Sequence, residues 1–323
     1  MSNNLYEATK GIWASKDCEG LSARWANELE AAKIQALTLA RFHEWKPLKV
    51  FTSLSKARKP KPVFSLRYQG QEVAELVADD VPALLIKASH ETNNLKGFGL
   101  KTPSGKFDWR STEAAGFRKM FKELKQSKSN PFKMKSDEAW LQSIIFDTMV
   151  KTGEAGYHAC QPVLFDRFPF QCPIPISANS GTPKASKGNL DVLARRGQGN
   201  THPAIWELKA PKTCKTAFEQ VYIYGVALAL MLRGIGGALW YKNMGYSGKL
   251  NKDKTLTIDL ILAITKDREE ELHSHLKAFT DPLKLEYEKI VFKPYVAYYE
   301  WDKSKDKVII EELIDLSKYL KNT

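Results

Sequence analysis

The stretch GNLDVLARRGQGNTHPAIWELKAPKTCKTAFEQVYIY, residues Gly188–Tyr224, decides the fold. Its apolar and β-branched segments predict two strands, at Asn189–Arg196 and Ala204–Ala210, and its last third predicts a helix. The residues between the strands are rich in glycine, asparagine and proline, which favour chain reversal. We therefore expect the two strands to pair as a hairpin about Gly199–Asn200.

Two carboxylates and an ammonium group come together in this hairpin. Side chains two residues apart on a strand share a face, so Glu207 and Lys209 point the same way. The expected register sets Asp191 roughly opposite Leu208. Charged groups inside apolar strands are costly unless they are paired or serve a ligand. The sequence therefore predicts a cluster of Asp191, Glu207 and Lys209 near one strand end.

This cluster suits metal-assisted phosphodiester hydrolysis. Mg²⁺ prefers oxygen ligands and keeps several of its waters, so Asp191, Glu207 and the carbonyl of Leu208 would be sufficient protein ligands. A bound metal lowers the pKa of its water and stabilises charge on the phosphate. Lys209 would then hold the attacking water. Mn²⁺ is expected to substitute for Mg²⁺.

The arrangement of Asp191 and, after a hairpin, Glu207-Leu208-Lys209 resembles the D…(D/E)xK signature of the PD-(D/E)xK, or restriction-endonuclease-like, nuclease superfamily. Gln220 and Tyr224, four residues apart on the following helix, are similar to the QxxxY motif of its RecB-like branch. The sequence departs from the motif at Leu190, where the family has proline.

A segment upstream extends the resemblance. Ser136–Val150, SDEAWLQSIIFDTMV, is similar to the first core helix of these folds, with its glutamate at Glu138. The resemblance runs from about Ser136 to Thr265. It implies an α/β fold with an αβββαβ core around a mixed central sheet. It also implies that Glu138 adds a carboxylate to the metal, directly or through water, and that Gln220 orients a nucleotide phosphate.

Several residues flank the cluster and are candidates for binding nucleic acid. The loop Gln171–Asn189 is rich in proline, serine and glycine and runs into Asp191, so its lysines are placed to contact phosphates. An ordinary connecting loop has the same composition, and Tyr224 also suits a core position. The candidates are Lys184, Lys187, Lys212, Lys215 and Tyr224.

The net charge indicates the class of partner, and the length and charge distribution indicate the domain organisation. The 323 residues carry a formal charge of +12, which favours an acidic partner such as nucleic acid, although many basic proteins bind none. Residues 1–130 hold 22 Lys and Arg against 14 Asp and Glu. We expect a basic α+β domain at 1–130, which binds nucleic acid or has a regulatory role, and a nuclease domain at 131–323. DNA is favoured over RNA as the nucleic-acid partner.

The remaining features indicate a protein of the cytoplasm. No apolar run approaches the length of a membrane span, and the N-terminus lacks a signal-peptide core. Four cysteines without metal-like spacing fit a reducing compartment. The oligomeric state stays open, with a homo-oligomer as one option. The alternative function is a non-catalytic nucleic-acid-binding protein that uses a nuclease-like scaffold.

Periodicity predicts the other elements. We expect helices at Leu21–Trp45, Thr112–Gln126, Thr216–Arg233 and Asp267–Phe279, and strands at Val63–Tyr68, Glu72–Val77, Tyr157–Phe165, Gly237–Lys242, Leu256–Thr265, Ile290–Trp301 and Lys307–Leu313.

Overall fold

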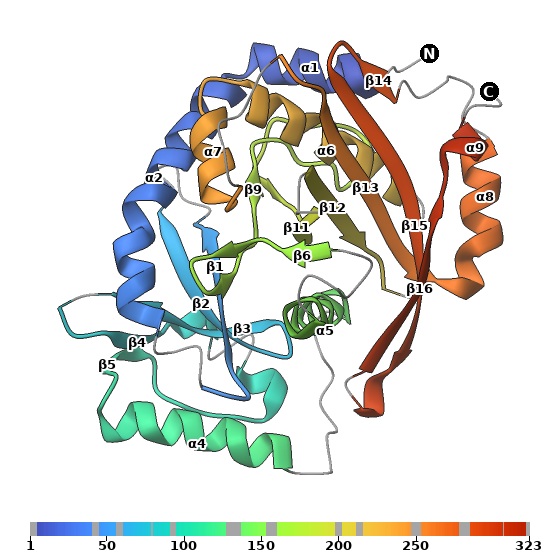
Figure 1. The fold of residues 1–323 in the computed structure, drawn as a ribbon. Coiled ribbons are helices and arrows are strands. Elements are labelled where there is room, and N and C mark those ends of the chain that lie inside the picture. Colours follow the sequence, from blue (N-terminus) through green and yellow to red (C-terminus); the bar gives the residue numbers. More distant parts are fainter. Residues whose placement is uncertain are drawn as a thin grey trace. The chain divides into compact units, whose positions relative to one another are not determined.

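The protein has a mixed α/β fold in two compact units (Figure 1). The computed structural model describes residues 5–40, 45–55, 61–78, 80–90, 95–126, 137–152, 160–197, 202–210, 216–246, 253–277, 285–305 and 307–320. The first unit comprises Met1–Asn27, Ile144–Val163 and Gln171–Thr323, and the second comprises Glu28–Ser143 and Leu164–Phe170. This division differs from the expected boundary after residue 130, because the helices α2 (Cys18–Leu39) and α5 (Asp137–Thr152) each give residues to both units.

The second unit is built on an antiparallel five-stranded sheet whose strands follow one another in chain order. Its elements are β1 Lys49–Leu54, β2 Pro62–Tyr68, β3 Gln71–Val77, β4 Ala83–Ile86, α3 Ala88–His90, η3 Lys96–Phe98, β5 Gly105–Asp108, α4 Thr112–Gln126, β7 Leu164–Phe165 and β8 Phe168–Pro169. The predicted strands Val63–Tyr68 and Glu72–Val77 are confirmed as β2 and β3, which pair antiparallel as a hairpin. Its turn has φ of 47° at Gln69 and 78° at Gly70, the left-handed pair that matches strand twist.

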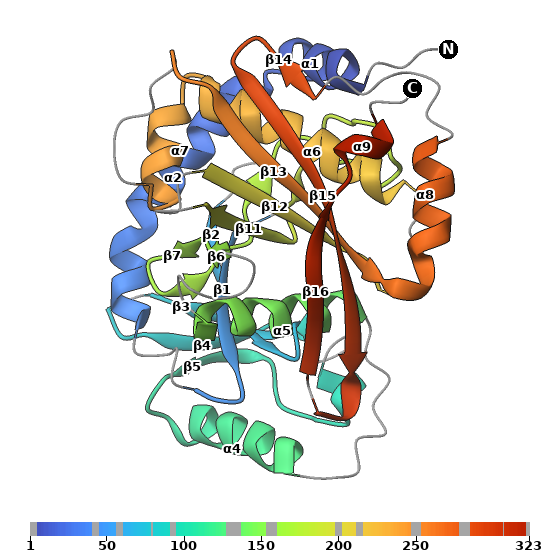
Figure 2. The same cartoon turned by 45° about the vertical axis from the view of Figure 1, so that its right-hand side comes forward.

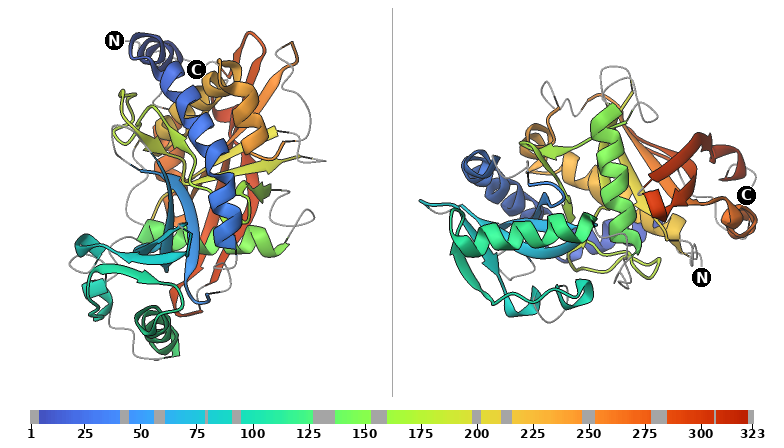
Figure 3. Two further views of the ribbon diagram at one scale, coloured as in Figure 1. Left: turned by 90° about the vertical axis from the view of Figure 1, so that its left-hand side faces the viewer. Right: turned by 90° about the horizontal axis from the view of Figure 1, so that it is seen from below.

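The helix α4 spans the predicted residues and is amphipathic. Phe117 and Phe121 are buried in the second unit, where Phe121 packs on Tyr68 of the sheet, while the lysines of the opposite face are exposed. Figure 3 shows α4 as a separate straight helix of this unit. Spacing by three and four residues was enough to predict it.

The first unit contains a mixed sheet in the order β14-β15-β13-β12-β11-β6, with β16 also paired to β15 (Figure 2). Its strands are β6 Cys160–Pro162, β11 Val192–Arg196, β12 His202–Leu208, β13 Leu256–Thr265, β14 Glu286–Tyr287, β15 Ile290–Asp302 and β16 Lys307–Asp315, and β9 Pro173–Ile174 pairs separately with β10 Gly188–Asn189. The strands β12, β13 and β15 are parallel. The helices are α1 Leu5–Ser15, α6 Ala217–Arg233, α7 Gly237–Asn243, α8 Glu269–Lys277 and α9 Ser317–Leu320, with η5 Lys266–Arg268 and η6 Lys303–Lys305.

The core of this unit surrounds α6, the crossover between the parallel strands β12 and β13. Fourteen of its residues are buried, because α1 and the sheet both pack on it. Gly225 permits the close approach to β13, since a Cβ there would lie 2.4 Å from Leu260 Cδ2.

The strand predicted at Gly237–Lys242 is wrong, because these residues form the helix α7. The apolar and aromatic run is typical of a strand, but tertiary contacts hold it as a helix. Trp240 Nε1 donates to Ser22 Oγ at 2.9 Å, and Asn243 Nδ2 donates to the Ala26 carbonyl at 3.1 Å. The helix therefore depends on a partner more than 200 residues away in sequence.

The first core strand also ends earlier than expected. Of the predicted strand Tyr157–Phe165, residues 157–159 lie outside the described residues, Cys160–Pro162 joins the central sheet, and Leu164–Phe165 forms the separate strand β7. The strands at Leu256–Thr265, Ile290–Trp301 and Lys307–Leu313 are confirmed within two residues at each end. Among the described helices none is long and apolar enough to cross a membrane alone, although the bent pair α6 and α7 passes by length and composition.

Candidate functional site

The hairpin of β11 and β12 positions the predicted cluster. The two strands pair antiparallel, as predicted. The strand β11 is shorter than expected, whereas β12 has the expected length but begins and ends two residues earlier. Val192 lies opposite Trp206, so continuing the ladder sets Asp191 towards Glu207 rather than Leu208. The expected register was therefore out by one residue.

The Asp191 side chain nevertheless reaches Leu208. Its Oδ2 accepts the Leu208 backbone N–H at 2.8 Å. The described ladder ends one residue earlier, so the carboxylate serves as acceptor where the strand pairing stops. A charge-assisted hydrogen bond of this kind ties the ends of the two strands together and orients the carboxylate.

Glu207 and Lys209 form a buried ion pair at the end of β12. Lys209 Nζ donates to Glu207 Oε1 at 2.6 Å, and the side chains are 15% and 2% exposed. Both main-chain groups of Lys209 are also held. Its N–H donates to the Ala263 carbonyl at 3.0 Å, and its carbonyl accepts the Tyr299 hydroxyl at 2.6 Å. The adjacent strand β13 and the strand beyond it, β15, thus keep Lys209 in position past the end of its own strand.

Tyr224 and Gln220 of α6 face the same cluster. Burial, together with the charges of Glu207 and Asp191, raises the pKa of Tyr224 to about 12, although hydrogen bonds with the Ala178 backbone and Gln220 act in the opposite direction. The phenol is therefore protonated near neutral pH, and its hydroxyl donates to Asn179 Oδ1 at 3.4 Å. Both motif residues are buried, with exposures of 1% for Tyr224 and 9% for Gln220.

The other candidates are less well placed or not described. Lys184 is exposed and Lys187 is half-buried. Lys212 and Lys215 lie outside the described residues. Glu138 belongs to the second unit, so its role at the metal stays a prediction.

Two residues of this neighbourhood were missed by sequence reasoning. Tyr299, which binds the Lys209 carbonyl, is 90 residues away in sequence and lies on β15. Asn179, which accepts from Tyr224, lies in a loop between β9 and β10. Neither belongs to a local motif, so no pattern in the sequence signals them.

The donor set suits a hard divalent cation. The N–H and carbonyl of one strand residue project towards the same neighbour, so the Leu208 carbonyl lies on the side where its N–H meets Asp191. Carboxylate oxygens of Asp191 and Glu207 with this carbonyl match what Mg²⁺ or Mn²⁺ takes in proteins. The chemical type of these donors agrees with the expected metal, whose binding stays a prediction.

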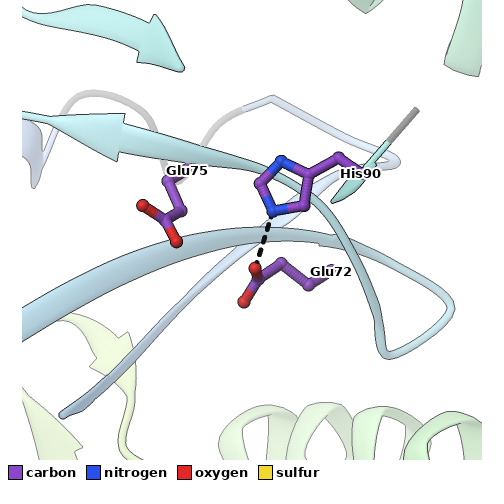
Figure 4. A group of neighbouring side chains, drawn as sticks. All are labelled: Glu72, Glu75 and His90. Atoms are coloured by element: carbon purple, nitrogen blue, oxygen red, sulfur yellow. Dashed lines mark hydrogen bonds and ion pairs between the residues drawn. The ribbon is translucent and has the colours of Figure 1, made fainter. Parts of the chain in front are cut away.

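A second group of metal-ligating side chains lies in the second unit (Figure 4). His90 Nδ1 accepts the Lys87 N–H at 3.1 Å, so Nε2 carries the ring proton and donates to Glu72 Oε1 at 2.8 Å. Glu75 forms an ion pair with the Lys87 ammonium. Burial raises the pKa of Glu72, but the His90 hydrogen bond and the charges of Arg67 and Lys87 outweigh it and lower the pKa. The group is therefore satisfied internally, and neither His90 nitrogen offers a lone pair to a metal.

Comparison with known proteins adds no family: no protein-family model, curated protein or solved structure matches this chain.

Proposed function

We propose that this protein is a metal-dependent nuclease that hydrolyses phosphodiester bonds, most readily in DNA. The observation that carries the proposal is the meeting of Asp191 with Leu208, one residue from the buried Glu207–Lys209 pair. Two carboxylates and an ammonium held at one strand end have the composition needed for phosphate-ester cleavage.

The order of elements supports the restriction-endonuclease-like fold as part of this proposal. Along the chain α5, β6, β11, β12, α6 and β13 follow the αβββαβ sequence, with the short strands β7, β8, β9 and β10 inserted between β6 and β11 and the helix α7 inserted before β13. In the sheet, β6, β11, β12 and β13 are consecutive neighbours. The candidate residues lie at the carboxyl end of β12, where a parallel sheet commonly presents its ligand.

Each residue has a definite task in the proposal. Asp191, Glu207 and the Leu208 carbonyl hold the divalent cation, which supplies a nucleophilic water of lowered pKa and neutralises phosphate charge. Lys209 orients the attacking water and stabilises negative charge that develops on it. Gln220 and Tyr224 support the carboxylates from α6, and Glu138 is a candidate for a further carboxylate.

Isosteric substitutions test the proposal. We expect Asp191→Asn and Glu207→Gln each to reduce single-turnover cleavage of DNA in Mg²⁺ by at least about a hundredfold, because metal coordination supplies several kcal/mol to the transition state. Asp191→Asn keeps an acceptor for the Leu208 N–H, so the fold should persist. The matched control is Asp253→Asn, since its side chain is 92% exposed in the same unit.

The substrate panel should contain linear, circular and single-stranded DNA and RNA. If both variants cleave DNA at the wild-type rate, the assignment of these carboxylates as metal ligands is contradicted. Binding of nucleic acid without cleavage by the wild-type protein in Mg²⁺ or Mn²⁺ would favour the alternative, a binding protein on a nuclease-like scaffold.

A further inference from the structure

A narrow turn, Ser177–Lys184, precedes β10 in the first unit. The Ser177 N–H donates to the Lys184 carbonyl at 3.0 Å, and the Lys184 N–H donates to the Ser177 carbonyl at 2.9 Å. Inside it the Gly181 N–H donates to the Ala178 carbonyl at 2.8 Å. Three backbone hydrogen bonds thus define the conformation of a segment that has no regular secondary structure.

The turn is anchored on α6. Ala178 is fully buried, and Gly181 is buried with a left-handed φ of 71°. A Cβ on Gly181 would lie 2.6 Å from Cβ of Thr216, the residue that precedes α6. The tip of the turn therefore packs against the beginning of this helix, and only a glycine fits there.

Tyr224 connects the turn to the carboxylates. Its hydroxyl donates to Asn179 Oδ1, and its ring lies against the chain that returns from the turn: a Cβ on Gly188 would lie 3.0 Å from the Tyr224 oxygen. Gly188 precedes Asp191 by three residues, a span of about 10 Å on an extended chain. One buried side chain thus contacts both the turn, at Asn179, and the chain that follows it, at Gly188, and lies within the field of Asp191 and Glu207.

The chemistry of the exposed side chains is that of a phosphate-contacting loop. Asn179, Ser180, Thr182 and Lys184 are exposed, and the Ser180 and Thr182 hydroxyls are 2.9 Å apart. The segment 167–190 contains no aspartate or glutamate but includes Arg167, Lys184 and Lys187. Hydroxyl and ammonium donors on the segment that leads to Asp191 can attract a phosphate backbone that carboxylates alone would repel.

We propose that the Ser177–Lys184 turn is the substrate-positioning loop, in which Ser180, Thr182 and Lys184 hold a backbone phosphate of the nucleic-acid strand next to Asp191 and Glu207. Asn179 and Tyr224 are positioning residues that set the place of the turn. The inference rests on the proposed nuclease function and adds the part of the chain that places the strand.

The experiment compares the variant Ser180→Ala/Thr182→Ala/Lys184→Gln with the control Lys254→Gln, which removes one exposed positive charge elsewhere in the same unit. The probe is a fluorescein-labelled DNA duplex, followed by anisotropy without divalent metal and by cleavage in Mg²⁺. We expect Kd and KM to rise about tenfold, while kcat stays within about twofold, since the turn binds phosphate but does no chemistry. The slope of log affinity against log salt should fall by about 0.9, the value for one phosphate contact.

Tyr224→Phe separates positioning from direct contact. It removes the hydroxyl that donates to Asn179 and keeps the ring, so KM should rise while the salt slope stays unchanged. If the triple variant does not fold, the single variant Lys184→Gln replaces it, because substitution of an exposed side chain leaves the fold intact. Its salt slope should also fall by about 0.9.

The outcomes distinguish this inference from the proposed function. Turn variants that bind and cut like the control overturn the inference and leave the nuclease assignment intact. A wild-type protein that binds the duplex but cleaves nothing overturns the nuclease assignment. In that case the affinities alone test the inference: weaker binding by the turn variants than by the control supports the phosphate-binding role of the turn. A wild-type protein that binds no nucleic acid overturns both.

Discussion

At the scale of single residues, Lys209 has two alternative roles. Its 2.6 Å contact with Glu207 is what a structural counter-charge would make. Its side chain is also 15% exposed, at the end of a strand, which suits a group that holds a water for reaction. The geometry of the pair is the same in both cases, so the difference lies in what a replacement cation can do.

Lys209→Arg discriminates between these roles. A planar guanidinium can pair with Glu207 but cannot present a compact ammonium to one water oxygen. We expect cleavage to fall by at least about a hundredfold while binding of metal and DNA persists, as for loss of a positioned proton-handling group. Single-turnover cleavage at saturating Mg²⁺, with calorimetry of metal binding, measures both properties. An arginine variant that cuts at nearly the wild-type rate would make Lys209 a counter-charge only.

At the scale of elements, the turn of the β2–β3 hairpin lies close to the helix α5 in the second unit, and a substitution in this turn can test that approach. Gly70 has a φ of 78°, and a Cβ there would lie 1.8 Å from the Ala139 carbonyl oxygen of α5. Backbone strain and overpacking each cost on the order of 1–3 kcal/mol, so we expect Gly70→Ala to lower the free energy of unfolding by about 3 kcal/mol or more.

Gly116 supplies the matched control. It lies within α4, and a Cβ added there would have no side chain or neighbouring segment of the described residues within 4 Å. Gly116→Ala should therefore stabilise the protein by about 0.5–1 kcal/mol through helix propensity. Urea unfolding monitored by circular dichroism measures both variants. If Gly70→Ala and Gly116→Ala change the free energy of unfolding equally, the hairpin does not lie as close to α5 as described.

The contact between α8 and α6 predicts a dependence on pH. His275 Nε2 lies 2.8 Å from Glu219 Oε1, and this hydrogen bond raises the pKa of His275 above the usual 6.5. A raised folded-state pKa means that the stabilisation is complete below pH about 6.5 and is lost as the pH rises through the folded-state pKa.

His275→Gln should therefore reduce the free energy of unfolding more at pH 5.5 than at pH 8.5. Thermal unfolding across this range measures the effect, and His273→Gln is the control because His273 lies on the same helix and stacks on Tyr319 instead. If His275→Gln has the same dependence of stability on pH as the wild-type protein, the contact between His275 and Glu219 does not contribute to that dependence.

At the scale of the whole molecule, the interleaved units change how the basic N-terminal half must be tested. Residues 1–27 belong to the first unit, where α1 packs on α6. Deleting residues 1–130 would therefore damage the unit that carries the candidate site. Charge substitution on α4, whose Lys119, Lys122 and Lys125 are exposed, leaves both units intact.

If the second unit binds DNA through α4, the variant Lys119→Gln/Lys122→Gln/Lys125→Gln should flatten the plot of log affinity against log salt. The slope should fall by up to about 2.7, that is about 0.9 for each phosphate that the variant no longer neutralises. The control carries Lys254→Gln, Lys289→Gln and Lys318→Gln in the first unit, all at exposed positions. Equal slopes for the two triple variants would remove α4 from the binding surface.

The sequence by itself determined the elements whose signals are local. Apolar and β-branched segments around a turn rich in glycine and asparagine predicted β11 and β12, and a local helical pattern predicted α4 and α6. These signals lie within the element that they describe, so they act before any tertiary contact forms. The contact of Asp191 with Leu208 and the Glu207–Lys209 pair are local in the same sense, since one hairpin carries all of these residues.

Only the tertiary structure decided the rest. Gly237–Asn243 is a helix because Ser22 and Ala26 bind it, and Asn179 and Tyr299 reach the cluster from distant segments. The two units interleave because α2 and α5 each give residues to both. Such contacts depend on how apolar faces pack across the whole chain, and packing has no fixed spacing in sequence that a local pattern could record.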